Sequence, residues 1–321
     1  MRILIALAGS AGGVLLLWLV FGFLVFQKFL SRKAADPCRE MAKKWTAGEA
    51  TDPNSPDERF LIDWALAHHT EPVSMQSRDG LKLIGTMFRQ SQPGSPWVIL
   101  VHGYTCNKET MAYAAQKFYD EMGWNVLAVD LRGHGESEGK TISMGWLDRL
   151  DLTRWTEWLA AQNPGCDITL FGISMGAATV MMTSGEQLPA AVKSIVADCG
   201  YTSAADVFAH NAKVILHLPA WFVLPPANLF SRLLAGFDFW EASALEQVRK
   251  NTRPLFLIHG GSDNFVPTKM IYPLHEAAGG DVRMLVVPGA GHGEAVQKDD
   301  TYWAQVFAFV GAQLDRVPER S

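Results

Sequence analysis

The 321-residue chain has few features of a disulfide scaffold, a metal site or a nucleic-acid-binding surface. No two of its four cysteines form a Cys-x-x-Cys pair, so the spacing predicts neither a disulfide framework nor a zinc site. No His-Glu-x-x-His motif occurs, and Gly133-His-Gly135 lacks the longer dinucleotide-binding fingerprint. The formal net charge of −5 leaves no broad basic face. We therefore expect no metal site and no nucleic-acid partner.

Charged residues are scarce at 19%, whereas hydrophobic residues make up 48% of the chain. This composition excludes a disordered, collagen-like or coiled-coil protein and provides enough apolar side chains for a core. The length fits one large α/β domain or two smaller domains.

Charge is absent altogether from residues 3–26. As a helix this run would be roughly 36 Å long, enough to cross a hydrocarbon core of about 30 Å. We predict a transmembrane anchor at residues 3–27. A cleaved signal peptide is the alternative, but the run exceeds the usual signal core and no clear small-x-small cleavage site closes it.

The charges that flank the anchor favour a cytoplasmic location for the large domain that follows it. Basic residues gather after it, at Lys28, Arg32, Lys33, Arg39, Lys43 and Lys44, against Arg2 before it. A signal anchor with the domain outside the cell stays open as an alternative.

Residues 28–71 are predicted to form a juxtamembrane lead-in, and residues 72–316 the main domain. A hairpin is expected around Arg78-Asp79-Gly80, followed by six short apolar runs beginning at Trp97, Asn125, Ile168, Ser194, Pro254 and Val282. Helical segments near 109–122, 144–162, 175–188, 267–277 and 301–315 separate them. This alternation predicts an α/β fold with a mostly parallel eight-stranded sheet and helices on both faces. Residues 201–250 interrupt the alternation and predict a helical cap over the carboxyl edge of the sheet.

A possible nucleophile lies in Gly172-Ile-Ser-Met-Gly176, between a predicted strand and a predicted helix. A serine at such a sharp turn needs glycines around it, because neighbouring backbone approaches closely. The helix that follows would direct its N–H groups at developing negative charge. By itself the motif is common, so the strand before it and the helix after it are what favour Ser174 as a nucleophile.

A base and an acid follow Ser174 in the chain. His292 lies in a glycine-rich loop after a predicted strand, and Asp263 lies just past the preceding strand. The order serine, aspartate, histidine is that of an α/β-hydrolase triad. Asp263 could also serve as a turn residue or helix cap, and Asp130 and Asp198 are rival third members, but Asp263 is the predicted acid.

The Val101-His-Gly-Tyr-Thr105 segment supplies candidates for an oxyanion hole. We predict that the Tyr104 and Met175 N–H groups bind the oxyanion. His102 and His134, each beside glycine, are better explained as braces of their loops.

These segments resemble the α/β-hydrolase superfamily from about residue 72 to 314. The matching pieces are His102-Gly-Tyr-Thr105, Asp130-Leu-Arg-Gly-His-Gly-Glu-Ser137, Gly172-Ile-Ser-Met-Gly176, Gly261-Ser-Asp-Asn-Phe-Val-Pro267 and Gly291-His292. The chain looks like membrane-anchored bacterial hydrolases of the cinnamoyl-esterase-like and dipeptidyl-aminopeptidase-like type. The resemblance implies serine-hydrolase chemistry without a metal or organic cofactor, and it does not define the substrate.

From these residues we predict a membrane-bound serine hydrolase that cleaves a small-molecule carboxylic ester. A peptidase or thioesterase with the same triad is an alternative, and so is a catalytically silent membrane scaffold on the same fold. The oligomeric state stays open. Apolar cap residues are candidates for the substrate pocket: Trp221, Phe222, Leu224, Phe230, Leu233, Leu234 and Trp240.

Overall fold

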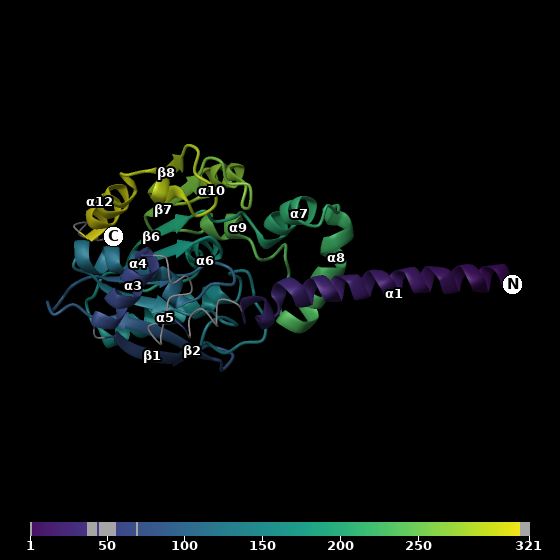
Figure 1. Cartoon of the computed structure of the whole chain (residues 1–321), viewed down its shortest axis with the longest axis horizontal. Coiled ribbons are helices and arrows are strands. Elements are labelled where there is room, and N and C mark those ends of the chain that lie inside the picture. The colour runs from purple at the N-terminus through teal and green to yellow at the C-terminus, as the bar shows by residue number, and fades with distance from the viewer. Residues whose placement is uncertain (1, 37–43, 45–55, 69, 315–321) are drawn as a thin grey trace.

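A computed structural model describes residues 2–36, 44, 56–68 and 70–314, and an eight-stranded sheet lies at its centre (Figure 1). The strand order is β1-β2-β4-β3-β5-β6-β7-β8; β1 and β2 are antiparallel to their neighbours, and the other pairs are parallel. The strands are β1 (Thr70–Gln76), β2 (Lys82–Phe88), β3 (Trp97–Val101), β4 (Asn125–Val129), β5 (Ile168–Ile173), β6 (Val192–Asp198), β7 (Leu255–Gly260) and β8 (Val282–Val287). The predicted mostly parallel sheet is confirmed.

Both faces of the sheet are buried, which explains why its central strands are continuously apolar. In β3, Ile99 and Val101 belong to one hydrophobic core, and Val98 and Leu100 to the core on the opposite face. This period of two follows from the pleat of a strand. The first core is covered by α5 (Asp148–Gln162), α6 (Met175–Thr183), α9 (Ala244–Val248) and α10 (Ile271–Ala277). The second is covered by α3 (Pro56–Ala67), η2 (Lys108–Met111), α4 (Ala112–Gln116), η3 (Lys117–Glu121) and α12 (Tyr302–Leu314). Three further short helices are η1 (Arg32–Ala35), η5 (Thr268–Met270) and α11 (Ala295–Lys298).

The predicted helical cap is present between β6 and β7. It comprises α7 (Ala204–Val214), α8 (Ala220–Phe230) and η4 (Ser231–Ala235), and it returns to the sheet through α9. A bridge between Ser203 and Ser243 closes the base of the insertion, and the Ser203 hydroxyl caps α7 by accepting the Asp206 N–H at 3.0 Å. The cap is therefore anchored at both ends.

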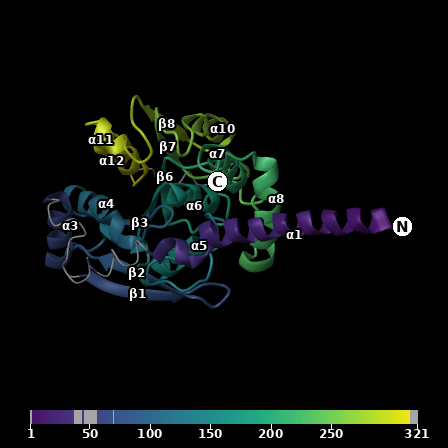
Figure 2. The same ribbon diagram turned by 45° about the vertical axis from the view of Figure 1, so that its right-hand side comes forward.

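Helix α1 (Arg2–Leu30) projects from the body of the molecule, with its N-terminal end farthest from the sheet (Figures 1 and 2). Gly12–Leu30 is long and apolar enough to cross a membrane, with a mean hydropathy of 2.1. Only 17% of that window is buried. Most of the stretch therefore presents apolar side chains outward.

The C-terminal end of α1 is nevertheless built into the domain. Phe26 and Leu30 are 1% and 2% exposed and belong to the core beside α5 and α6. The Leu30 carbonyl accepts the Ile142 N–H at 2.8 Å, and the Arg32 guanidinium donates to the carbonyls of Gly135 and Gly139 at 2.9 and 3.1 Å. Burying two such side chains is worth roughly 1.5–3 kcal/mol each. The domain core thus includes residues ahead of the predicted boundary at 72, while much of the predicted lead-in lies outside the described residues.

Candidate active site

Ser174 occupies a strained turn between β5 and α6. Its φ of 58° and ψ of −115° lie in a region that non-glycine residues rarely adopt, at a cost of about 1–3 kcal/mol. Its N–H donates to the Asp198 carbonyl at 2.8 Å, which helps to hold the turn. A Cβ at Gly172 would lie 2.3 Å from the Gly176 carbonyl oxygen, and one at Gly176 would lie 2.0 Å from that of Val101. Both flanking glycines are therefore required by the close approach of backbone.

The structure brings together the three side chains predicted to act on substrate. His292 Nε2 lies 2.9 Å from Ser174 Oγ, and His292 Nδ1 lies 2.7 Å from Asp263 Oδ2. The three residues follow β5, β7 and β8, whose carboxyl ends meet at one edge of the parallel sheet. The Asp263 side chain is completely buried, whereas that of His292 is 24% exposed. A serine, an imidazole and a carboxylate thus form a continuous hydrogen-bonded chain.

Asp263 is surrounded by donors that keep it ionised. Its Oδ1 accepts the N–H groups of Phe265 and Val266, both at 2.9 Å, and His259 Nε2 lies 3.3 Å from its Oδ2. Burial by itself would raise the pKa of Asp263, but the hydrogen bonds from His259, His292 and the backbone hold that pKa well below its usual range. Sequence reasoning missed His259, although its position four residues before Asp263 was a signal.

The two rival aspartates have other partners. Asp130 accepts the Lys108 N–H at 2.8 Å and the Lys108 Nζ at 3.0 Å, so its carboxylate holds the loop after β3. Asp198 accepts the Tyr302 hydroxyl at 2.8 Å, and burial raises its pKa. In the described part of the chain, Asp263 is the acid that is hydrogen-bonded to His292.

His102 and His134 are loop braces in the structure. His102 Nε2 accepts the Leu131 N–H at 3.0 Å, so its Nδ1 carries the proton and donates to the Gly103 carbonyl at 2.8 Å. Burial holds the pKa of His102 well below its usual range and that of His134 below it. Both rings are therefore neutral. His134 Nδ1 lies 3.0 Å from the Arg132 carbonyl oxygen, while its Nε2 is buried without a partner among the described residues.

Tyr104 and Met175 lie on the same cavity as Ser174. Met175 is the first residue of α6, whose N-terminal N–H groups carry partial positive charge. Tyr104 lies in the loop that follows β3. In the same loop, a Cβ at Gly103 would lie 3.4 Å from Ser174 Cβ. Both residues are thus beside the nucleophile, and their role as oxyanion donors stays a prediction. Burial raises the pKa of Tyr104 to about 12, and its hydroxyl donates to the Phe29 carbonyl at 2.7 Å.

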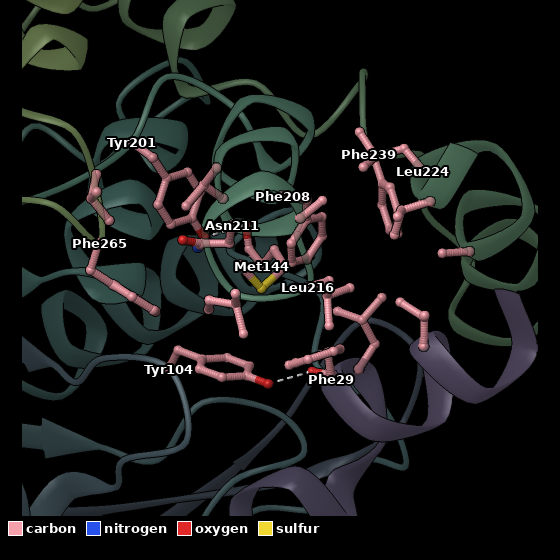
Figure 3. A pocket seen from close by; sticks show the side chains of 18 of the residues that line it. Phe29, Tyr104, Met144, Tyr201, Phe208, Asn211, Leu216, Leu224, Phe239 and Phe265 are labelled. Atoms are coloured by element: carbon pink, nitrogen blue, oxygen red, sulfur yellow. Dashed lines mark hydrogen bonds between the residues drawn. The ribbon is translucent and has the colours of Figure 1, made fainter. Parts of the chain in front are cut away.

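A cavity of about 160 Å³ opens next to Ser174. Figure 3 shows side chains that line it, among them Tyr104, Phe208 and Phe265. Its walls come from the cap, from the loops at the sheet edge and from α1. They are almost entirely apolar, and the wall residues that sequence reasoning did not name include Val25, Phe29, Leu30, Met144, Tyr201, Phe208, Ile215, Leu216, Phe239 and Phe265. The participation of α1 in this wall was not predicted.

Of the seven residues predicted to form the pocket, the structure places one in the wall of the cavity. Leu224 lines the cavity. Phe222 and Phe230 pack against aromatic rings of α1, and Trp221, Leu233, Leu234 and Trp240 are exposed. The reason is helical geometry: one cap helix presents separate faces to the cavity, to α1 and to the outside. Apolar character did not distinguish among them.

Comparison with known proteins identifies the family. Residues 98–306 match the model of the "Alpha/beta hydrolase family". The chain belongs to this family. The hydrolase is 30% identical over 220 residues to protein YqkD of Bacillus subtilis strain 168, covering 68% of this chain and 72% of the relative. It is 31% identical over 225 residues to protein Rv2307c of Mycobacterium tuberculosis strain H37Rv, covering 69% and 72% of the two chains.

A solved structure of the Pyrococcus furiosus esterase Pf2001 has the same fold. It is 26% identical to the hydrolase, with a TM-score of 0.64, over 78% of this chain and 95% of the esterase. The predicted fold class and the prediction of a hydrolase are therefore confirmed.

Proposed function

We propose that the protein hydrolyses a carboxylic ester through a Ser174 acyl-enzyme intermediate. The observation that carries this proposal is the hydrogen-bonded chain from Ser174 through His292 to Asp263, with contacts of 2.9 and 2.7 Å. Similarity to an esterase and an apolar cavity beside the serine support an ester over an amide as substrate.

Each side chain has a defined part in the reaction. His292 Nε2 takes the hydroxyl proton as Ser174 Oγ attacks the ester carbonyl, and the same imidazole then gives that proton to the leaving alcohol. Water, deprotonated by His292, next attacks the acyl-serine and releases the acid, and the proton returns to Ser174 Oγ. Asp263 holds the imidazole with its proton on Nδ1 and stabilises the imidazolium. The Tyr104 and Met175 N–H groups would bind the oxyanion, a contribution of about 3 kcal/mol for each donor.

A matched substrate panel tests the proposed reaction. We expect the full-length protein to react with a fluorophosphonate probe at Ser174 and to hydrolyse 4-nitrophenyl butyrate faster than the butyryl thioester or anilide. Faster cleavage of the thioester or the anilide would instead favour a thioesterase or a peptidase. Absence of both labelling and turnover would favour the silent scaffold.

We also propose that α1 is retained as a membrane anchor with the catalytic domain in the cytoplasm. Phe26 and Leu30 of α1 complete the domain core, so cleavage after the apolar run would remove buried side chains. The basic residues after the run favour the cytoplasmic side. In intact cells, added protease should leave the domain whole, and it should digest the domain after lysis. Digestion before lysis would place the domain outside.

A further inference from the structure

The wall of the cavity is partly made by the helix proposed as the anchor. Val25, Phe29 and Leu30 of α1 line the same cavity as Ser174, and Figure 3 shows Phe29 in this wall. Val25 and Phe29 are one helical turn apart on the same face, and Leu30 borders that face. The segment that reaches the membrane is therefore also in contact with the space beside the nucleophile.

Three contacts hold α1 in this position. The Phe29 carbonyl accepts the Tyr104 hydroxyl at 2.7 Å, next to the nucleophile. Nearer the N-terminus of α1, the Trp18 indole N–H donates to the Phe222 carbonyl of the cap at 2.8 Å. Between them, a Cβ at Gly22 would lie 2.3 Å from Pro226 Cβ, so α1 and α8 touch through their backbones. These contacts join α1 to both the site and the cap.

The place where α1 crosses α8 limits how far the domain stands from a bilayer. Residues 3–21 precede the crossing at Gly22, and as a helix they are roughly 28 Å long, slightly less than a hydrocarbon core of about 30 Å. A spanning α1 therefore brings α8 to the edge of the hydrocarbon.

The composition of the cap suits that position. The α8 sequence, AWFVLPPANLF, has no charged residue. Apolar side chains are exposed on α8 and η4, which follows α8, and also on α1, which packs against α8. They are Trp221, Leu229, Leu233 and Leu234 of α8 and η4, and Val14, Leu15, Leu16, Leu17, Val20 and Leu24 of α1. Arg232 is 68% exposed among them, and a guanidinium on a long stem can reach lipid headgroups.

The cavity itself selects for an apolar group. No residue of its wall carries a formal charge, and apolar cavities of about this size stay dry and take up hydrocarbons. Its few polar groups include the Ser174 and Tyr104 hydroxyls and the amide of Asn211, whose Oδ1 is buried without a partner among the described residues. A charged or strongly hydrated acyl group would lose its hydration here without compensation.

We propose that the substrate is a membrane-resident ester of a long-chain fatty acid, and that α1 forms part of its acyl site. The proposal rests on the ester-hydrolase function described above. The part of the acyl chain next to the carbonyl fills the cavity against Val25 and Phe29, while the remainder stays in the bilayer. The ester reaches Ser174 laterally, beside α1 and α8, without leaving the membrane. Residues of the anchor therefore determine acyl-chain specificity.

Two neighbouring tryptophan substitutions test the acyl site. The full-length protein is placed in phosphatidylcholine nanodiscs, and kcat/KM is measured for 4-methylumbelliferyl oleate in the same nanodiscs and for 4-methylumbelliferyl acetate in solution. Val25→Trp should lower the oleate-to-acetate ratio about tenfold or more, because displacing only two methylenes from an apolar site has that effect. Leu24→Trp makes the same change at a side chain that is 59% exposed, and it should leave the ratio within about twofold.

The outcomes separate this proposal from the ester-hydrolase function. An unchanged ratio in Val25→Trp, with acetate turnover intact, would overturn the acyl site alone. If acetate turnover is lost in Val25→Trp as well, Phe29→Ala provides the second measurement, since removing that wall should also lower the ratio. Wild-type protein that turns over neither ester and does not react with a fluorophosphonate would overturn the hydrolase function itself.

The source of the ester is tested by where it is presented. Oleate ester in the nanodiscs that hold the enzyme should be consumed, and the same ester in separate phosphatidylcholine vesicles should be consumed at least about tenfold more slowly, because an ester leaving a bilayer exposes its whole chain to water. Equal rates would overturn lateral access from the membrane.

Discussion

Replacing Asp263 with asparagine should lower kcat for ester hydrolysis by about 10⁴-fold while the protein stays folded. Asp263 Oδ2 accepts the His292 Nδ1 proton at 2.7 Å, whereas Oδ1 accepts backbone N–H groups that an asparagine carbonyl can still accept. The amide NH₂ would then face His292 Nδ1 and favour the tautomer that carries its proton on Nε2. In that tautomer Nε2 cannot accept the proton of the Ser174 hydroxyl. Steady-state kinetics with a 4-nitrophenyl ester and a circular-dichroism melt measure the two effects.

Asp198→Asn is the matched control for that prediction. Asp198 is buried, accepts the Tyr302 hydroxyl at 2.8 Å and has a raised pKa, so a neutral amide of the same shape fits its surroundings. We expect kcat within about threefold of the wild type, as for a substitution away from the reacting groups. A large loss in Asp198→Asn together with near-normal turnover in Asp263→Asn would reverse the assignment of the acid.

Ser174→Ala should abolish fluorophosphonate labelling and lower kcat by about 10⁶-fold, because no other group can form the acyl-enzyme. Alanine keeps the strained backbone at φ 58°, so the free energy of unfolding should change by less than about 1 kcal/mol. Mass spectrometry of the labelled protein identifies the modified residue, and ester turnover is followed in parallel.

Ser262→Ala provides the control on the neighbouring loop. Ser262 is exposed and directly precedes Asp263, but it has no part in the proposed reaction. It should label and turn over ester at the wild-type rate. Persistent labelling of Ser174→Ala, with the probe on another side chain, would show that the nucleophile lies elsewhere.

The position of α1 connects the proposed chemistry with the proposed membrane anchor. In many membrane-bound enzymes an anchor serves only to hold a domain at the surface. Here Phe26 and Leu30 are in the domain core, and Val25 and Phe29 line the cavity beside Ser174. Truncation of α1 would therefore remove part of the cavity wall beside Ser174, so ester hydrolysis should be measured on the full-length protein.

The sequence by itself determined the sheet and the candidate triad. Buried strands such as Trp97–Val101 and Asn125–Val129 were predicted with the bounds that the structure has, because a strand buried on both faces must be apolar throughout. Ser174, Asp263 and His292 were found from local patterns: each lies just after an apolar strand, and parallel strands bring such positions to one edge.

Only the tertiary structure decided which apolar residues line the cavity beside Ser174. Trp221, Phe222 and Leu224 lie close together in the sequence, yet they are exposed, packed on α1 and lining the cavity, respectively. The exposed face of α8, the face packed on α1 and the face toward the cavity all carry apolar side chains, so no pattern in the sequence distinguishes the three faces. The contribution of α1 was hidden for a related reason: a run apolar enough to span a membrane is also apolar enough to form a cavity wall, and only packing in three dimensions shows that its last turns line the cavity.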